Sequence, residues 1–453
     1  MRAIVIEQDG QGRADSLAAR LMANGITVRR LANATNIPDA AIYGGATQAA
    51  RAPAGSYVVD FAQPQGRLAK ALLEPDAQLD SSFIRQELES RRTNQPERFY
   101  DMTAWSLPYT FRVRAYSTRS VPAGSELAAD AFSRPAGQGV VPGASPQYGY
   151  AFAPGSEASI RLLAILLRDS VRVWYARRSF RVGQASFPEG AFLVRVFAND
   201  TSVHRRVREG IVATNARVAA LASAFVDEGT DLGSNSVIPI RIPRVALVGG
   251  SPIQGNSFGF SWYTFDQRIG YPVTTVTAQN LAGLLSNFDV VVIPSVGAGA
   301  LDNTLGEGGR SALGAWVRSG GVLVTLDGAT AWLASERTGL SRLRLRRDTA
   351  RADSAGGAPL PADVPGAILR AHGDTLSPLL AGVRTSDIPV LLFSDRFYTT
   401  PRDQHESHGE GVYRIQPVHN GHVDAALFAN GFATVTRTYD KLSSCHSASL
   451  CDW

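Results

Sequence analysis

Three short apolar runs set the pattern of the chain between residues 244 and 335. They are Val245–Val248, Asp289–Ile293 and Val322–Leu326, and they stop at glycine, proline and aspartate respectively. Runs of β-branched residues without alternation are typical of strands buried on both faces of a parallel sheet. Apolar residues at helical spacing lie between them, at Leu281, Leu284 and Leu285 and at Leu313, Trp316 and Val317. Alternating strands and helices predict an α/β domain with a parallel sheet.

A second pattern occurs twice in the first 210 residues. The segment Pro53-Ala-Gly55-Ser-Tyr57-Val-Val returns as Pro188-Glu-Gly190-Ala-Phe192-Leu-Val. Both copies have an upstream helical stripe, apolar strand positions and a following helix: Ala14, Leu17, Ala18, Leu21, Ile26, Val28, Leu68 and Leu72 in the first, and Ile160, Leu163, Ala164, Leu167, Val171, Val173, Val203 and Val207 in the second. Each glycine permits a tight turn into the next strand. We interpret the pattern as a duplication; convergence of two ordinary α/β units is the alternative.

These patterns divide the chain into three units. Two tandem duplicated α/β units are predicted at residues 1–115 and 148–228, and a parallel-sheet domain at 244–400. Segments rich in proline, glycine, alanine and serine predict linkers at 116–147 and 229–243 and a loop at 351–363. Residues 401–453 have no periodicity and are predicted to be an irregular tail, either a disordered extension or a sequence read out of frame.

Composition and charge exclude several classes of protein. The formal net charge is +5, but Lys70 and Lys441 are the only lysines and the arginines are scattered, so we expect no nucleic-acid binding. No apolar run has the length of a membrane span. The N-terminus is too short and acidic for a signal peptide and predicts a strand, which is consistent with an internal piece of a longer protein. Both cysteines, Cys445 and Cys451, lie in the tail, which excludes a disulfide framework.

A zinc site is the first chemistry to test, because the tail is rich in possible ligands. They are His405, Glu406, His408, Glu410, His419, His422 and Asp424. The pair His405 and His408 is one residue short of the helical spacing that places two imidazoles on one face. A His-x-x-Glu pair would also serve, but no histidine of this chain has glutamate three residues later. The sequence therefore predicts no metal site.

A glutaminase-like nucleophile is the second possibility. In class I glutamine amidotransferases a strand leads through a sharp turn that bears cysteine into a helix, and a His-x-Glu pair follows. Residues 322–333 have this strand-turn-helix pattern, and His408-Gly-Glu410 supplies the pair. The turn position holds Leu326 or Asp327, neither of which forms a thioester. We interpret Asp327 as an N-cap for the helix that carries Trp332 and Leu333.

The glycine-rich loop Gly249–Gly255 is the third candidate. It matches neither the dinucleotide fingerprint nor the phosphate loop, which needs Gly-Lys-Ser/Thr. Turn geometry is the preferred interpretation. The loop, like Gly297-Ala-Gly299, could also line a small-molecule cleft. No residue is therefore assigned a catalytic, cofactor-binding or metal-binding role.

Several segments together resemble the C-terminal half of large bacterial zinc carboxypeptidases of the carboxypeptidase A-like metallopeptidase family. The matching stretches cover residues 1 to about 400 and are 53–64 (PAGSYVVDFAQP), 100–108 (YDMTAWSLP), 231–248 (DLGSNSVIPIRIPRVALV), the glutaminase-like unit 244–335 and 365–369 (PGAIL). The resemblance implies a flavodoxin-like, glutamine amidotransferase-like third domain. It also implies an exported protein, periplasmic or secreted, in which a signal peptide and a catalytic zinc domain precede this region. The tail departs from the family pattern.

Two functions follow as hypotheses. The first is an accessory region of a zinc carboxypeptidase-like protein, without the zinc ligands and inactive alone, whose partner is the peptidase domain. The second is a free-standing module that binds a sugar or a peptide end on the glutamine amidotransferase-like fold. A degenerate amidotransferase is a weaker third, because the cysteine is absent. We expect no cofactor in this chain, since zinc is implied only for the upstream domain.

Overall fold

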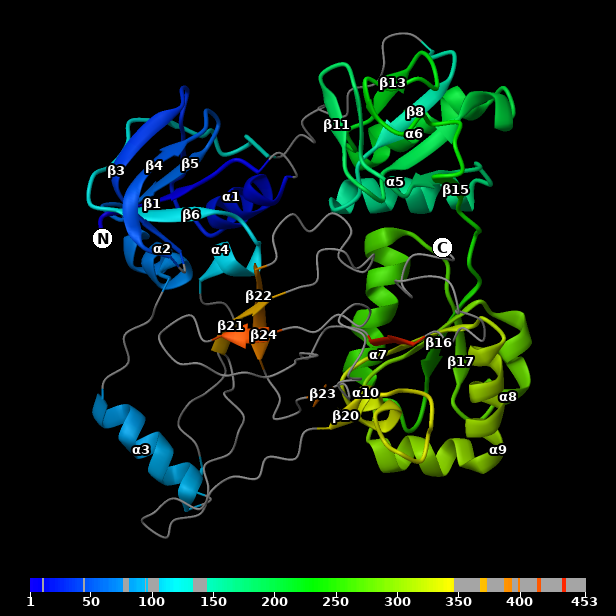
Figure 1. Cartoon of the computed structure of the whole chain (residues 1–453). Coiled ribbons are helices and arrows are strands. Elements are labelled where there is room, and N and C mark those ends of the chain that lie inside the picture. Colours follow the sequence, from blue (N-terminus) through cyan, green and yellow to red (C-terminus); the bar gives the residue numbers. More distant parts are fainter. Residues whose placement is uncertain are drawn as a thin grey trace, which may run out of the picture.

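The fold was analysed in a computed structural model of the 453-residue chain (Figure 1). The structure describes residues 1–9, 12–43, 45–75, 81–93, 95–96, 106–132, 145–345, 367–372, 387–392, 398–399, 414–416 and 434–436. It is a mixed α/β protein with several antiparallel sheets and one parallel sheet, which confirms the predicted α/β class. We refer to the first unit (residues 1–132), the second unit (145–239) and the third unit (244–345).

The first unit is built on a seven-stranded sheet in which every neighbouring pair is antiparallel. In sheet order its strands are β4 (Thr47–Ala52), β3 (Thr35–Ile42), β6 (Ala115–Thr118), β1 (Ala3–Ile6), β5 (Tyr57–Asp60), β2 (Arg29–Arg30) and β7 (Ser125–Glu126). The predicted N-terminal strand is β1, and its four residues are completely buried. Strand β7 and most of β6 lie within residues 116–147, the range that the sequence predicts as a linker.

Four helices belong to the first unit: α1 (Arg13–Ala23), α2 (Gly66–Leu73), α3 (Ser81–Arg92) and α4 (Leu107–Thr110). The predicted stripe of α1 is confirmed, because all four of its residues are fully buried. The helix predicted around Leu68 and Leu72 is present as α2, but its buried face differs: Leu68 is 39% exposed, and Ala69 and Leu73 face the core. A Cβ on Gly66 would lie 1.9 Å from the Phe61 carbonyl oxygen. The face of α2 that contains Gly66 therefore packs inward.

The second unit contains one five-stranded antiparallel sheet and a smaller three-stranded sheet. The larger sheet has the order β13 (Ala219–Leu221), β8 (Gly149–Phe152), β12 (Phe192–Arg195), β9 (Trp174–Ala176) and β15 (Val237–Pro239), and the smaller has β11 (Ala185–Phe187), β10 (Phe180–Val182) and β14 (Glu228–Gly229). Its helices are α5 (Glu157–Arg168), the 3-10 helix η1 (Val196–Ala198) and α6 (Val203–Thr214). Strand β15 lies within residues 229–243, also predicted as a linker.

The central strands of these two sheets follow one another in the same way. The order β6-β1-β5-β2-β7 of the first unit corresponds to β13-β8-β12-β9-β15 of the second. The last residue of β1, Ile6, is opposite Tyr57, and the last residue of β8, Phe152, is opposite Phe192. The apolar positions Ile26, Val28, Val171 and Val173 are buried, but they precede β2 and β9 instead of lying within them.

Helix α5 begins at a capped turn, where the Ser156 hydroxyl accepts a hydrogen bond from the Ser159 N–H at 3.0 Å. The predicted stripe is only partly right. Ala164 and Leu167 are buried, but Ile160 and Leu163 are half-buried and Leu162 and Leu166 are completely enclosed. This burial is wider than one stripe because α5 packs against its own sheet, against α6 and against the third unit.

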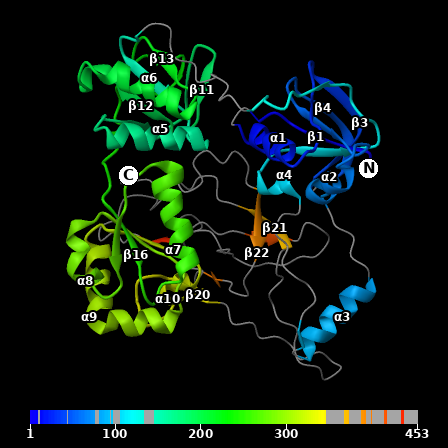
Figure 2. The same ribbon diagram turned by 180° about the vertical axis from the view of Figure 1, so that it is seen from behind.

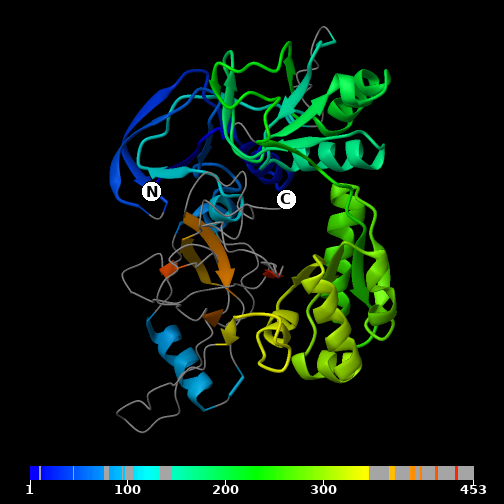
Figure 3. The ribbon, with the colours of Figure 1, turned by 45° about the vertical axis from the view of Figure 1, so that its right-hand side comes forward.

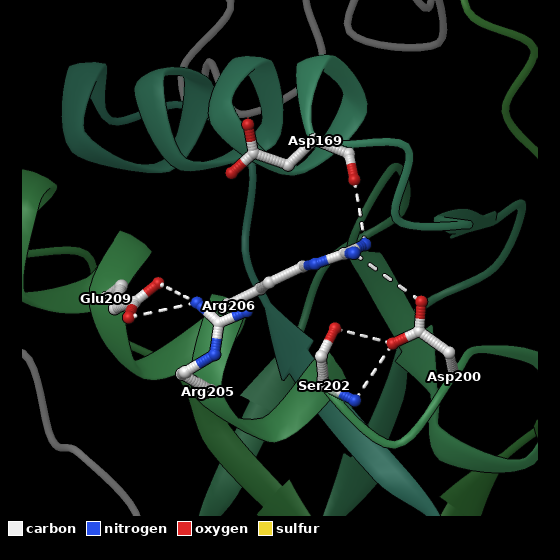
Figure 4. A network of polar contacts seen from close by, with 6 residues as sticks. All are labelled: Asp169, Asp200, Ser202, Arg205, Arg206 and Glu209. Atoms are coloured by element: carbon white, nitrogen blue, oxygen red, sulfur yellow. Dashed lines mark hydrogen bonds and ion pairs between the residues drawn. The ribbon is translucent and has the colours of Figure 1, made fainter.

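Polar contacts tie α6 to the end of α5 (Figure 4). Arg206 donates from Nη1 to the main-chain oxygen of Asp169 at 2.8 Å, and its Nη2 lies 3.5 Å from Oδ2 of Asp200. Asp200 accepts hydrogen bonds from the hydroxyl and the N–H of Ser202, and these two bonds lower the pKa of Asp200. Exposed ion pairs contribute little, so the bond from Arg206 to the carbonyl at the end of α5 is the main polar link, beside the apolar packing of the two helices.

The third unit is the predicted parallel sheet. Strands β17 (Thr274–Thr277), β16 (Val245–Gly249), β18 (Val290–Ile293) and β19 (Val322–Thr325) are parallel neighbours in this order, and β25 (Thr434–Thr436) adds an antiparallel edge. The three apolar runs form β16, β18 and β19, as the sequence predicts. The helices are α7 (Gly255–Trp262), the π-helix η2 (Tyr263–Ile269), α8 (Leu281–Leu284), the 3-10 helix η3 (Leu285–Asn287), α9 (Ala298–Arg318) and α10 (Gly328–Leu333).

The second and third units share one hydrophobic core. A single cluster contains Leu162 and Leu166 of α5 together with Leu247, Tyr271 and Val292 of the third unit. At its margin Arg268 of η2 donates to Glu157 of α5 at 2.6 Å. Figures 2 and 3 show α5 between the sheet of the second unit and the helix formed by α7 and η2. These two units therefore pack as one body.

Several predictions fall on residues beyond the described ranges. The loop at 351–363 lies outside them, and in the tail at 401–453 only β24 (Arg414–Gln416) and β25 are described. The remaining short strands are β20 (Arg344–Leu345), β21 (Ala367–His372), β22 (Asp387–Leu392) and β23 (Tyr398–Thr399). Among the helices that the structure describes, none has the length and apolar character of a membrane span.

Substitution of Gly149 tests the packing of the second sheet. A Cβ at this position would lie 2.1 Å from the main-chain oxygen of Val194, on the paired strand β12. Because backbone cannot move aside as a flexible side chain does, Gly149→Ala should lower the free energy of unfolding by about 3 kcal/mol, the upper end of overpacking costs. Gly233→Ala is the control, since nothing lies within 4 Å of its Cβ position. Equal urea-unfolding curves for the two variants would contradict the predicted clash.

Candidate functional site

The carboxyl edge of the parallel sheet is the candidate site. Strands β16, β18 and β19 run in parallel and end at this edge. Strand β16 lies between β17 and β18 in the sheet. The chain passes from β16 to β17 on one side and then crosses to β18 on the other, so the strand order reverses between β16 and β18. Ligands of open α/β sheets bind outside the carboxyl ends of the strands, at such a reversal.

The chain turns sharply at Asp327, between β19 and α10. Asp327 has φ 45° and ψ −113°, a backbone conformation that residues with a Cβ rarely adopt. The next residue must be glycine, because a Cβ on Gly328 would lie 2.2 Å from the Val296 carbonyl oxygen. The Leu326 N–H donates to the Ile293 oxygen at 3.0 Å and ties the turn to β18. Backbone strain of this kind costs about 1–3 kcal/mol and clusters at ligand sites.

The Asp327 carboxylate is held by the neighbouring strand end. The Ser295 hydroxyl donates to Oδ2 of Asp327 at 2.6 Å, and Ser295 is only 4% exposed. The sequence predicts Asp327 as the N-cap of α10, and the structure confirms this position, but the side chain makes no capping hydrogen bond. The unusual backbone conformation of Asp327 accompanies this contact with β18, which takes the place of a bond to the helix.

Residues that follow β16 hold the backbone of Ser295 by hydrogen bonds. Its N–H donates to the Ser257 hydroxyl at 2.9 Å, and its carbonyl accepts from the Gln254 N–H at 2.9 Å. The glycines of this loop have the turn role that the sequence predicts. Gly250 has φ 71°, and a Cβ on Gly249 would lie 2.6 Å from the ring of Phe258. Hydrogen bonds therefore connect the ends of β16, β18 and β19.

A second carboxylate, Asp302 of α9, anchors α10. It accepts from the indole N–H of the buried Trp332 at 3.3 Å and pairs with Arg310 at 2.9 Å. Helix α9 is interrupted at Gly306, which has φ 61° and ψ −173°, so the pair between Asp302 and Arg310 bridges the interruption. Asp302 is engaged in holding these helices together.

The group at this edge that can contact a ligand is the Asp327 carboxylate, which accepts hydrogen bonds. The turn has the strand-to-helix shape predicted from residues 322–333, and the position that would hold an acyl-transfer nucleophile is Asp327. Ser295 carries a hydroxyl, but its burial and its bond to Asp327 keep it away from a substrate. Asp327 is half-buried and is the member of this pair that a ligand can reach.

Sequence reasoning found Asp327 but missed Ser295 and Ser257. Ser295 follows Pro294, directly after the apolar run that forms β18, and a polar residue at the end of a parallel strand is a usable signal. Ser257 has no comparable signal, because its role depends on how α7 begins.

The possible metal ligands of the tail, His405, Glu406, His408, Glu410, His419, His422 and Asp424, lie outside the described residues. Within the described ranges, no group of three or more histidine, cysteine, aspartate or glutamate side chains could hold a metal ion. The prediction of no metal site in the tail therefore stays a prediction.

Comparison of the chain with protein-family models, curated proteins and solved structures finds no match. The resemblance to zinc carboxypeptidases therefore rests on the motifs of this sequence alone.

Two substitutions at Asp327 test the role of its carboxylate. Asp327→Asn keeps an acceptor for the Ser295 hydroxyl and tolerates positive φ, so we expect a change in unfolding free energy within about 1 kcal/mol. Asp327→Ala leaves that buried hydroxyl without its acceptor and should cost about 1–3 kcal/mol. Urea unfolding of both variants measures the difference. If alanine is tolerated as well as asparagine, the contact between Ser295 and Asp327 does not stabilise the turn.

Proposed function

We propose that the first and second units are duplicates of one α/β unit. The matching strand order and the matching register of Tyr57 and Phe192 support this proposal. The two glycines of the repeated segment also agree: Gly55 and Gly190 have φ 85° and 82°. The Gly55 N–H donates to the Leu31 carbonyl oxygen, and the Gly190 N–H donates to the Ala176 carbonyl oxygen, both at 2.8 Å. Leu31 directly follows β2 and Ala176 ends β9, so the two acceptors lie at nearly equivalent positions. Convergence would not require this agreement in hydrogen bonding.

We further propose that the third unit is a flavodoxin-like, glutamine amidotransferase-like domain. Its parallel strand order β17-β16-β18-β19 and its intervening helices support a doubly wound topology. The strained turn at Asp327, between a strand and a helix, has the shape of a nucleophile turn. The residue at the turn lacks a thiol, so this is the fold without glutaminase chemistry.

For the whole chain, we propose an accessory region of an exported zinc carboxypeptidase-like protein, without peptidase activity of its own. The observation that carries the proposal is the retained turn, in which Asp327 stands where acyl transfer needs a nucleophile and Ser295 binds its carboxylate. The resemblance in residues 1 to about 400 supports the same view. The accessory region would pack against the peptidase domain or shape access to it.

The purified chain should bind no stoichiometric zinc and should release no C-terminal residues from peptides. The reason is chemical, since no histidine in the sequence is followed by glutamate at the third position. Metal analysis after dialysis against zinc, with a carboxypeptidase assay on blocked dipeptides, measures both properties. One tightly held zinc per chain, or hydrolysis that a chelator abolishes, would contradict the proposal.

The DNA upstream of the Met1 codon offers an independent test. The accessory role is supported by an open frame there that encodes a His-x-x-Glu pair and a distal histidine. Its absence would favour the second candidate, a free-standing module that binds a sugar or peptide end. The half-buried Asp327 at the carboxyl edge supports that candidate. Protection of the edge from hydrogen exchange by a ligand, lost in Asp327→Ala, would establish it.

A further inference from the structure

The second unit carries an open cavity of about 490 Å³, far in sequence from the turn at Asp327. It is lined by Arg178, Ser179, Glu189, Gly229 and Thr230. Its volume lies in the range of about 300–1,000 Å³ that small-ligand sites occupy. The lining is polar, unlike the mostly apolar lining of drug-sized sites, so its chemistry suits a small polar molecule.

Hydrogen bonds and strand pairing hold the backbone around this cavity. The Gly190 N–H donates to the Ala176 oxygen at 2.8 Å, so Glu189 at the turn lies beside the segment that leads from β9 to Arg178. Gly229 pairs with Phe180, and a Cβ on Gly229 would lie 2.5 Å from the Ser179 oxygen. With φ 96° as well, only glycine suits this position. The cavity walls therefore stand on hydrogen-bonded strands and turns.

Residues of opposite charge line this cavity. Arg178 and Glu189 both line it and both are exposed. Neither has an ion-pair partner within the described part of the chain, although the neighbouring Arg181 is paired with Glu228. Guanidinium offers planar donors that match a carboxylate, and a glutamate accepts hydrogen bonds from an ammonium group. A ligand with one charge alone would leave the other protein charge unmatched.

We propose that this cavity binds an α-amino acid zwitterion, whose carboxylate contacts Arg178 and whose ammonium group contacts Glu189. Ser179 and Thr230, which carry hydroxyls, also line the cavity. The site lies in the second unit and does not depend on the accessory role or on the carboxyl edge of the third unit. A failure here would leave the zinc and peptidase measurements unaffected, so the two proposals fail separately.

Saturation-transfer NMR with L-alanine tests the proposal on the full chain. Because both charges are exposed, we expect a dissociation constant on the order of 1 mM. N-acetyl-L-alanine lacks the ammonium group and L-alaninamide lacks the carboxylate. Each analogue should bind about ten-fold more weakly, as expected when one charged hydrogen bond is lost. Equal binding of either analogue, or no binding of alanine, overturns the proposal.

Two variants assign the charges to the two ends of the ligand. Arg178→Gln should weaken alanine about ten-fold and leave alaninamide unchanged, and Glu189→Gln should weaken alanine but leave N-acetylalanine unchanged. Arg172→Gln and Glu209→Gln are matched controls, because both residues belong to the second unit but do not line the cavity. Circular dichroism verifies folding. If the cavity variants bind alanine as the controls do, the site is wrong.

Discussion

Helix α5 is buried on two sides, and the second and third units depend on this double burial. Its Leu162 and Leu166 contribute to a cluster that also contains Leu247 and Val292 of the parallel sheet. Full burial of one leucine stabilises a protein by about 1.5–3 kcal/mol. The pair between Arg268 and Glu157 at the margin is about half exposed, with side-chain exposures of 58% and 49%, and contributes at most about 1 kcal/mol. Apolar contact, not charge, therefore joins these units.

Much of the fold could be read from hydrophobic spacing. The runs that form β16, β18 and β19 lack alternation because both faces of a parallel sheet are covered, and the stripe of α1 is narrow because one face packs on one sheet. The same rule failed where burial departs from one stripe. On α5 further contacts with α6 and with the third unit widen the buried face, and Leu162 lies against Gly210 of α6. On α2 the buried positions are Gly66, Ala69 and Leu73, while Leu68 is exposed. Such contacts are tertiary and leave no local period.

The linker predictions show a related limit. Residues 116–147 and 229–243 are rich in turn-forming residues, yet they contain β7 and β15, which are short strands at the edges of their sheets, and most of β6, which is paired on both sides. Strands of two or three residues need few β-branched side chains, because their partners supply the hydrogen bonds. At the candidate site, the position of Asp327 directly after an apolar run is enough to identify it from the sequence. Its contact with Ser295 depends on a backbone conformation that aspartate rarely adopts, and no spacing rule encodes it.

The interruption of α9 at Gly306 has a consequence for how the third unit assembles. Short isolated helices are marginal in water, because nucleation fixes several residues for a single hydrogen bond. Gly306 divides α9 into two such short helices, and the pair between Asp302 and Arg310 joins them across the break. Neither half would hold its shape in an unfolded chain. The helical form of both halves therefore depends on packing within the third unit, where Leu301 and Leu313 share one cluster with Ile293 and Leu323 of the sheet.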